Sequence, residues 1–193
     1  MNSSYIETIK AVDGEIFYIE YHQKRYEDVM RSLGVDDFAN LSDFIDPPKW
    51  GIYRCRLVYD EKSIEVTYHE YKKREICSLK VIFDNTIEYS KKYSNRDKID
   101  SLFSQKDDAD DILIIKNLLL TDTSIANIAL YRDGVWLTPK NPLLKGTTRA
   151  RLLDEGRIVE ADIKVQELRS FSQVALLNAM IDFDILERFD FLI

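Results

Sequence analysis

The chain is poor in cysteine, proline and glycine, with two, four and six of them among 193 residues. Cys55 and Cys77 show neither metal-ligand spacing nor a disulfide framework, so we expect no metal site and a buried, apolar role for each. No apolar run reaches the roughly 20 residues of a membrane span. The opening Met1-Asn2-Ser3-Ser4 leads into polar sequence without the apolar stretch of a signal peptide, which predicts a cytoplasmic protein without a membrane partner.

The chain also has fewer basic than acidic residues. The 27 Lys and Arg are outnumbered by 34 Asp and Glu, which gives a net charge of −7 and a pI near 5.0. A nucleic-acid partner would require a dense basic patch. The nearest candidate, Lys72-Lys73-Arg74, is flanked by Glu70 and Glu75 and is more typical of an exposed strand end. We therefore expect no nucleic-acid binding.

The hydrophobic and charged fractions, 45% and 32%, are those of an ordinary globular protein. Near the start, Tyr5–Lys10 alternates in the manner of a strand, Asp13-Gly14 is a turn, and 15–19 returns as a second strand. Residues 20–33 then predict an amphipathic helix ended by Gly34. Its apolar face would consist of His22, Tyr26, Val29, Met30 and Leu33.

Further strands are predicted at 53–59, 64–71 and 76–83, which would complete an antiparallel sheet packed on that helix. Beyond Asp84 the pattern changes to helices at 95–103 and 148–154 and strands at 111–115, 125–131, 136–138 and 171–181. The sequence thus predicts an α+β protein with two lobes. These are a small N-terminal lobe, residues 1–84, and a larger lobe, residues 85–193.

Candidate ligand-binding residues occur in two segments of the second lobe. Gly146, Thr147 and Thr148 open a predicted helix, where free N–H groups favour an anion such as phosphate. A threonine at any helix start looks much the same, so a simple cap is the alternative. Asp122 and Asn127 could hold a charged planar ligand, or Asp122 could merely end a turn.

A lysine at position 92 would supply a nucleophilic amine. Most lysines lie exposed on the surface, and composition alone does not distinguish Lys92 from Lys91, Lys80 or Lys116.

The order of these segments resembles the class IV aminotransferase family, the fold-type IV pyridoxal-phosphate enzymes, over nearly the whole chain. Glu7, Gly14, His22 and Arg25 match its opening pattern of an acidic strand, a turn and a helix with H-x-x-R. Lys92-Tyr93-Ser94-Asn95-Arg96 is similar to the segment of the covalently bound lysine. Segment 122–127 is similar to T-E-x-x-x-x-N, and Gly146-Thr147-Thr148-Arg149 to the G-I-T-R loop.

One further segment bears on the reaction. Asn178-Ala179-Met180 resembles the N-A-L-M stretch of aminodeoxychorismate lyases, where transaminases tend to carry a G-T-A type of sequence. The chain departs from the family in having Asp122 where most members have Glu, Ile6 where an aromatic residue is common, and Leu118 where Gly is common. It is also shorter than typical members, mainly in the first lobe.

The resemblance implies a pyridoxal 5'-phosphate enzyme. Lys92 would hold the cofactor covalently and move protons at the substrate. Asp122 would pair with the ring nitrogen, and Arg25, Thr147 and Thr148 would bind the phosphate. The resemblance completes the cofactor site with Asn127, Gly146, Asn178 and Ala179.

The implied activity is that of 4-amino-4-deoxychorismate lyase, a step of folate biosynthesis that releases pyruvate and gives 4-aminobenzoate. Two alternatives remain open: an aminotransferase acting on a branched-chain or D-amino acid, and a non-catalytic dimer that is either cofactor-binding or purely structural. The resemblance also implies a small-molecule amine substrate and a homodimer.

Overall fold

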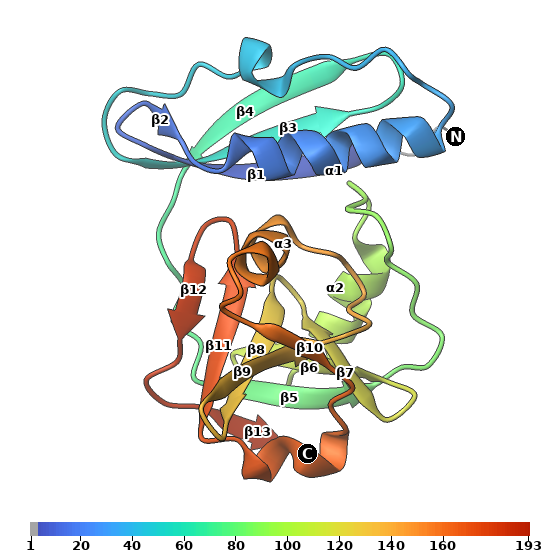
Figure 1. The fold of residues 1–193 in the computed structure, drawn as a ribbon, viewed down its shortest axis with the longest axis vertical. Helices are drawn as coiled ribbons and strands as arrows, with labels where there is room; N and C mark the ends of the chain where they lie inside the picture. Colours follow the sequence, from blue (N-terminus) through green and yellow to red (C-terminus); the bar gives the residue numbers. More distant parts are fainter. Residues whose placement is uncertain (1–3) are drawn as a thin grey trace. The chain divides into compact units, whose positions relative to one another are not determined.

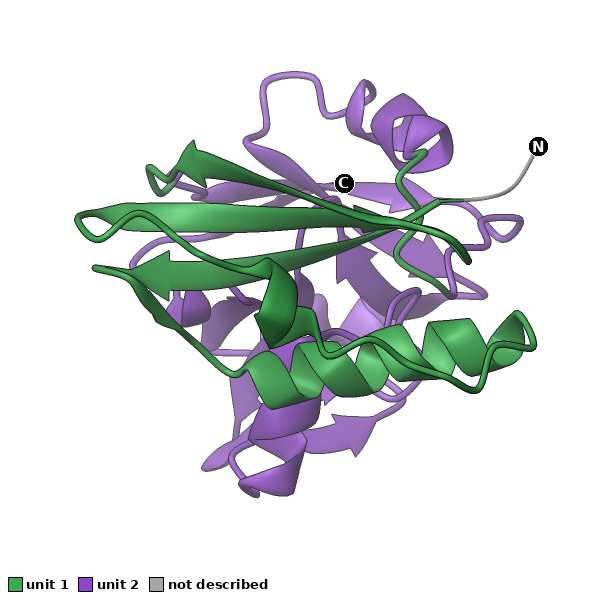
Figure 2. Ribbon diagram, turned by 90° about the horizontal axis from the view of Figure 1, so that it is seen from above, with its two compact units in different colours: residues 1–73, 91–95 green, residues 74–90, 96–193 purple. Residues whose placement is uncertain are grey.

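The computed structural model describes residues 4–193 and divides the chain into two compact units (Figure 2). Unit 1 contains the stretch up to Lys73 together with Lys91–Asn95, and unit 2 contains Arg74–Ser90 and Arg96–Ile193. The first boundary therefore lies about ten residues before the expected one at 84/85, and a short segment returns to unit 1. The beginning of the chain, in which we expect no signal peptide, falls at residues 1–3 outside the described residues.

Unit 1 is a four-stranded antiparallel sheet with a helix against one face (Figure 1). The strands are β1 (Tyr5–Val12), β2 (Glu15–Ile16), β3 (Ile52–Tyr59) and β4 (Ile64–Glu70), in the order β2-β1-β3-β4. Helix α1 (Ile19–Ser32) and the short 3-10 helix η1 (Leu41–Phe44) complete the unit. The helix buries four of the five residues expected on its apolar face, His22, Tyr26, Val29 and Met30.

The predicted strand at 76–83 exists, but its assignment to this first sheet is wrong. It forms β5 (Ser78–Phe83), which pairs in parallel with β6 (Asp111–Lys116) and β13 (Asp190–Leu192) of unit 2. An alternating pattern indicates which side chains face a core, but it does not identify the neighbouring strand.

The expectation for the cysteines is confirmed for one of them. Cys55 on β3 is fully buried in the core of unit 1. Cys77 is exposed, so the prediction of a buried role is wrong there. It lies just before β5, where its main-chain N–H donates to Oδ2 of Asp110 over 2.8 Å.

Unit 2 is built around a nine-stranded mixed sheet with the path β10-β9-β8-β7-β6-β5-β13. Strand β11 pairs with β8 and with β12. The remaining elements are β7 (Leu119–Thr123), β8 (Asn127–Arg132), β9 (Val135–Pro139), β10 (Val159–Ala161), β11 (Gln173–Asn178), β12 (Asp182–Ile185), α2 (Asp97–Phe103), α3 (Thr147–Asp154) and the 3-10 helix η2 (Val165–Ser170). Of these, β7, β10, β12 and η2 were not expected as separate elements, and neither were β13 and η1.

The fold class is α+β, as predicted, and each unit has its own core. In unit 2 the strand β6 is apolar from Ile112 to Ile115 and fully buried there, which is typical of a central strand covered on both faces. Helix α3 packs its Leu152 with Ala129 and Leu177 of β8 and β11. Within residues 4–193, no helix is long and apolar enough to cross a membrane.

The hairpin between β6 and β7 places two non-glycine residues in the left-handed region, Asn117 at φ 54° and Leu118 at φ 63°. Leu118 is 56% exposed and contributes little packing. We expect Leu118→Gly to raise the free energy of unfolding by roughly 0.5–1 kcal/mol, because Asn-Gly suits this turn and a β-carbon is unfavourable there. Urea denaturation monitored by circular dichroism measures the change.

A matched control is available in the turn between β8 and β9, where Gly134 has φ 83°. Gly134→Ala should lower stability by about 1 kcal/mol for the same reason. A loss of stability in Leu118→Gly would show that the leucine side chain, rather than the backbone conformation, governs this turn.

Candidate active site

The lysine segment runs beside the start of β1 within unit 1. The main-chain oxygen of Lys92 accepts from Ile6 N–H at 2.8 Å, and Ser94 N–H donates to the oxygen of Ser4 at 2.9 Å. Tyr5 and Tyr93 form an antiparallel bridge between these two hydrogen bonds. Tyr93 N–H also donates to the oxygen of Lys91 at 2.9 Å, which closes a tight turn at Lys92.

The two lysines of this segment interact with different residues. Nζ of Lys91 donates to Oγ of Ser32 at 2.5 Å and lies 5.6 Å from the ring centre of Tyr5. The charge of Lys92 instead acts on His22 and contributes to lowering its pKa. Lys92 is thus the lysine of this segment that lies toward the polar cluster of unit 1.

That polar cluster is centred on the carboxylate of Glu7, which is fully buried on β1. Arg25 Nε and Nη2 donate to its two oxygens at 2.8 and 2.5 Å, and Nδ1 of His22 lies 2.6 Å from Oε2. Burial acts to raise the pKa of Glu7, but the charge of Arg25 and the hydrogen bonds from His22 and Arg25 outweigh it and lower the pKa to about 2. Burial is the main cause that lowers the pKa of His22. The cluster therefore keeps Glu7 ionised and the guanidinium of Arg25 oriented.

In unit 2, Asp122 and Asn127 face each other across β7 and β8 as a register pair. Asn127 Nδ2 donates to Oδ1 of Asp122 at 2.7 Å, and Leu144 N–H donates to Oδ2 at 2.8 Å. Burial nevertheless raises the pKa of Asp122 to about 7, although these hydrogen bonds and the charge of Arg149 act to lower it. A buried carboxylate without an adjacent cation is suited to receive one.

Asn127 uses both ends of its amide on the protein. Besides Asp122, its Nδ2 donates to the oxygen of Leu144 at 2.8 Å, and its Oδ1 accepts from Gly146 N–H at 3.2 Å. A β-carbon on Gly146 would overlap Oδ1 of Asn127, so only glycine fits at this position. Asn127 therefore connects Asp122 with the loop that leads into α3.

Helix α3 begins at Thr147 with Gly146 as its N-cap and has no acidic residue in its first turn. The first N–H groups of a helix lack partners within the helix, and the helix dipole makes this end favourable for an anion. Thr147, Thr148 and Arg149 are each less than 10% exposed. Arg149 donates to Glu160 at 2.6 Å and to the oxygen of Pro139 at 2.8 Å, while its Nε is buried without a hydrogen-bond partner.

The segment 178–180 forms the turn after β11. Oδ1 of Asn178 accepts from Met180 N–H at 2.9 Å and from Ile181 N–H at 3.1 Å, and Nδ2 donates to the oxygen of Ile125 at 3.3 Å. Ala179 is half-buried in the same turn. Asn178 thus links this turn to the turn between β7 and β8.

The expected site residues fall into two groups, one in each unit. In unit 1 the structure brings Arg25 together with Glu7 and His22, and the charge of Lys92 acts on His22. It brings Asp122, Asn127 and Gly146 together at the start of α3 in unit 2. Sequence reasoning missed the main-chain N–H of Leu144 as a partner of Asp122; the signal for it would have been that a buried carboxylate needs donors.

Comparison with known proteins identifies the family. The family model "Amino-transferase class IV" matches residues 92–183. An uncharacterised protein of Haemophilus influenzae is 35% identical over 180 residues, which cover 90% of this chain and 96% of that protein. A protein of Schizosaccharomyces pombe, proposed as an aminodeoxychorismate lyase, is 37% identical over 82 residues, or 39% of this chain and 36% of its own length.

Among solved structures, a protein of Haemophilus somnus proposed as a 4-amino-4-deoxychorismate lyase superposes with a TM-score of 0.87. It is 31% identical, and the match covers 93% of this chain and 97% of that one. The fold and the family match therefore define an enzyme of the pyridoxal-phosphate-dependent, fold-type IV class. The chain belongs to the class IV aminotransferase family.

The residues present fit pyridoxal 5'-phosphate, the cofactor of this family. Its phosphate suits the start of α3, where glycine is required next to Asn127 and helical N–H groups gather. Its ring nitrogen, when protonated, would supply positive charge next to the carboxylate of Asp122, whose pKa is raised by burial. The roles of the individual residues remain predictions.

Glu7 makes the stability of unit 1 depend on pH in a defined direction. Its folded pKa of about 2 lies below the ordinary value of 4.5, so its contribution is present above pH 4.5 and is lost as the pH falls toward 2. We expect Glu7→Gln to lower the free energy of unfolding of the cofactor-free protein by about 3 kcal/mol at pH 7, because a buried ion pair is broken. Denaturation at pH 7, 4 and 3 should show the difference from wild type shrinking with acid.

Asp28 on α1 is the matched control, since it also pairs with an arginine, Arg31, but its side chain is 60% exposed. Asp28→Asn should change stability by less than about 0.5 kcal/mol. Equal losses of unfolding free energy in Glu7→Gln and Asp28→Asn at pH 7 would contradict the special role of Glu7.

Proposed function

We propose that the protein is a lyase that converts 4-amino-4-deoxychorismate into pyruvate and 4-aminobenzoate. The observation that carries this proposal is the 31% identity to the Haemophilus somnus protein over 97% of that chain. The matching stretch of the Schizosaccharomyces pombe protein and the segment Asn178-Ala179-Met180 also favour it. The reaction needs no further co-reactant, because the two products together contain all the atoms of the substrate.

Lys92 is the proposed catalytic residue. Lys91, its neighbour, has its ammonium engaged with Ser32 and lies over Tyr5, whereas the charge of Lys92 acts on His22. We assign to Nζ of Lys92 the covalent attachment of the cofactor. Once released, the same amine would take the proton from the substrate carbon that bears the amino group and deliver a proton to the departing enolpyruvyl group, which leaves as pyruvate.

The other residues bind and orient. The N–H groups of Thr147 and Thr148 at the start of α3 are proposed to hold the phosphate dianion. Arg25 keeps the phosphate-binding role that the family resemblance implies. Asp122 is proposed to hold a proton on the ring nitrogen, with Asn127 keeping its carboxylate in place. Pyridoxal phosphate, when bound, supplies an electron sink for the negative charge that develops at the substrate carbon.

A homodimer, a cytoplasmic location and a role in folate synthesis accompany the proposal as expectations from the family resemblance. Size-exclusion chromatography with light scattering measures the first of these on the purified protein. A mass of about 45 kDa corresponds to two copies of the 22.6 kDa chain.

The proposed reaction is tested by coupling pyruvate release to lactate dehydrogenase, with aminodeoxychorismate as substrate and added cofactor. We expect activity in the wild type and a loss of about 10³-fold or more in Lys92→Ala, because a proton-transfer group and the attachment point are both removed. Lys91→Ala is the matched control and should retain the wild-type rate. Activity that survives in Lys92→Ala and disappears in Lys91→Ala would refute the assignment.

The attachment point is tested separately from turnover. Borohydride reduction of the protein with pyridoxal phosphate, followed by peptide mapping, should place a stable label on Lys92 in the wild type and leave Lys92→Ala unlabelled. A labelled protein that aminates keto acids but releases no pyruvate would be an aminotransferase. A protein that gains neither label nor visible absorbance would be the non-catalytic alternative.

A further inference from the structure

The first turn of α3 contains a buried cation, Arg149, to which the function proposed above gives no role. Its side chain is 4% exposed, and its Nε is buried without a hydrogen-bond partner among residues 4–193. Burying a charged group costs free energy unless the group is paired and hydrogen-bonded. A helix that only had to pack on the sheet could carry an apolar residue here at lower cost. The contacts of the guanidinium indicate what it contributes instead.

These contacts lie on two neighbouring strands, β9 and β10. Nη2 of Arg149 donates to the main-chain oxygen of Pro139, the last residue of β9, at 2.8 Å. The same nitrogen donates to Oε1 of Glu160 on β10 at 2.6 Å. The two strands are parallel neighbours, and Pro139 lies opposite Ala161, the residue after Glu160. One nitrogen of the first turn of α3 is thus bonded to both strands.

Arg149 lies between two other contacts that hold the helix. Just before the helix, Gly146 N–H donates to Oδ1 of Asn127, the first residue of β8. In the second half of the helix, Leu152 packs with Ala129, which is also on β8. Arg149 adds a polar anchor on two further strands, β9 and β10. A helix held at three points has a fixed orientation, whereas one held at two points can still turn about the line that joins them.

The orientation of the first turn decides where its N–H groups point. Thr147 and Thr148, whose N–H groups are proposed to bind the phosphate, directly precede Arg149. The N–H of Ala150 donates to the oxygen of Gly146 at 2.9 Å, which closes the first turn of the helix. The N–H groups ahead of it therefore face out of the start of the helix. Because a hydrogen bond weakens steeply when its angle departs from linear, a tilt of this turn would weaken phosphate binding.

Resting on the function proposed above, we propose that Arg149 is a positioning residue for the phosphate group of the cofactor. Through its contacts with β9 and β10 it holds the first turn of α3 in the orientation in which Thr147 and Thr148 donate to the phosphate. Glu160 is the second member of this arrangement and supplies the counter-charge. Its side chain is 44% exposed, so it can be replaced without opening a cavity in the core.

A positive charge close to an anion would favour binding without any positioning, and the two explanations differ in sign for Glu160→Ala. If Arg149 acted by its charge alone, removing the negative charge beside it would strengthen phosphate binding. If it acts by positioning, the same change weakens binding, because one of its two anchors is lost. Arg149→Lys separates the explanations again, since it keeps the charge but not the planar guanidinium.

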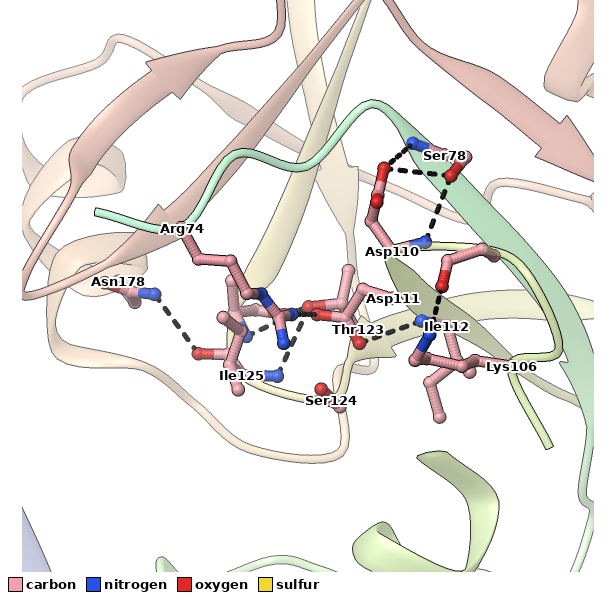
Figure 3. Close-up of polar contacts among 12 residues, drawn as sticks. Arg74, Ser78, Lys106, Asp110, Asp111, Ile112, Thr123, Ser124, Ile125 and Asn178 are labelled. Carbon is pink, nitrogen blue, oxygen red and sulfur yellow. Dashed lines mark hydrogen bonds and ion pairs between the residues drawn. The ribbon is translucent and has the colours of Figure 1, made fainter. Parts of the chain in front are cut away.

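Two matched controls alter similar ion pairs of unit 2. Glu155 lies at the other end of α3 and pairs with Arg151 at 2.6 Å, so Glu155→Ala removes an equal charge near the same helix. Arg74 lies 3.1 Å from a carboxylate oxygen of Asp111, as Figure 3 shows. Arg74→Lys therefore makes the same replacement as Arg149→Lys at an ion pair that has no member on α3.

The test measures the affinity of the full-length protein for pyridoxal phosphate and for pyridoxal, which lacks the phosphate, by titration of the visible absorbance. Glu160→Ala and Arg149→Lys should each bind pyridoxal phosphate about tenfold more weakly than wild type, because a charge-assisted contact is lost, and pyridoxal equally well. The double variant should be little weaker than either single variant. Glu155→Ala and Arg74→Lys should leave both affinities unchanged.

Tighter or unchanged binding of pyridoxal phosphate in Glu160→Ala would overturn the inference. Equal weakening for both ligands would also overturn it, because the effect would then not pass through the phosphate, and so would a wild type that binds both ligands equally well. If Arg149→Lys does not fold, Glu160→Ala decides in its place. The titrations use no substrate, so a wild type that releases no pyruvate would count against the proposed function and not against this inference.

Discussion

The hydrogen bond between Asn127 and Asp122 is the contact on which the candidate site in unit 2 depends. Asn127 joins a buried carboxylate on one strand to the loop that leads into α3. Oδ1 of Asn127 fills the space that a β-carbon at position 146 would occupy. The loop can therefore approach Asn127 only with glycine at this position. The start of the helix, the path of the loop and the position of the acid are therefore set by one amide group.

The two buried carboxylates at the candidate sites differ in a way that their surroundings explain. Glu7 faces a guanidinium through two hydrogen bonds, so its pKa falls to about 2 in spite of complete burial. Asp122 receives neutral donors and only the more distant charge of Arg149, so burial prevails and its pKa rises to about 7. The first group already has its counter-charge within the protein. A protonated ring nitrogen beside Asp122 would stabilise the ionised form of its carboxyl group.

Much of the fold could be predicted because its helices and hairpins are local. The apolar spacing of α1, the turn at Asp13-Gly14 and the start of α3 depend on residues close in sequence, and all are present in the structure. The partner of β5 could not be predicted, since its pairing with β6 and β13 joins segments about thirty and more than one hundred residues away. The short strands β10 and β12 carry too few residues for a period to appear.

The candidate residues were found by their order along the chain, and the contacts that hold them were not. Spacing pointed to Asp122 and Asn127, but the N–H of Leu144 reaches Asp122 through a loop that only folding brings close to it. The choice between Lys91 and Lys92 rested on the family resemblance. In the structure the contact of Lys91 with Ser32 gives it an independent basis.

The chain passes between the two units three times, at 73/74, 90/91 and 95/96. No single cut therefore separates them. A fragment ending at Lys73 would lose residues 91–95, whose main chain satisfies Ile6 N–H and the oxygen of Ser4, and would expose polar groups at the rim of the small sheet. A deletion that removes the smaller unit completely must therefore excise two separate stretches of the sequence.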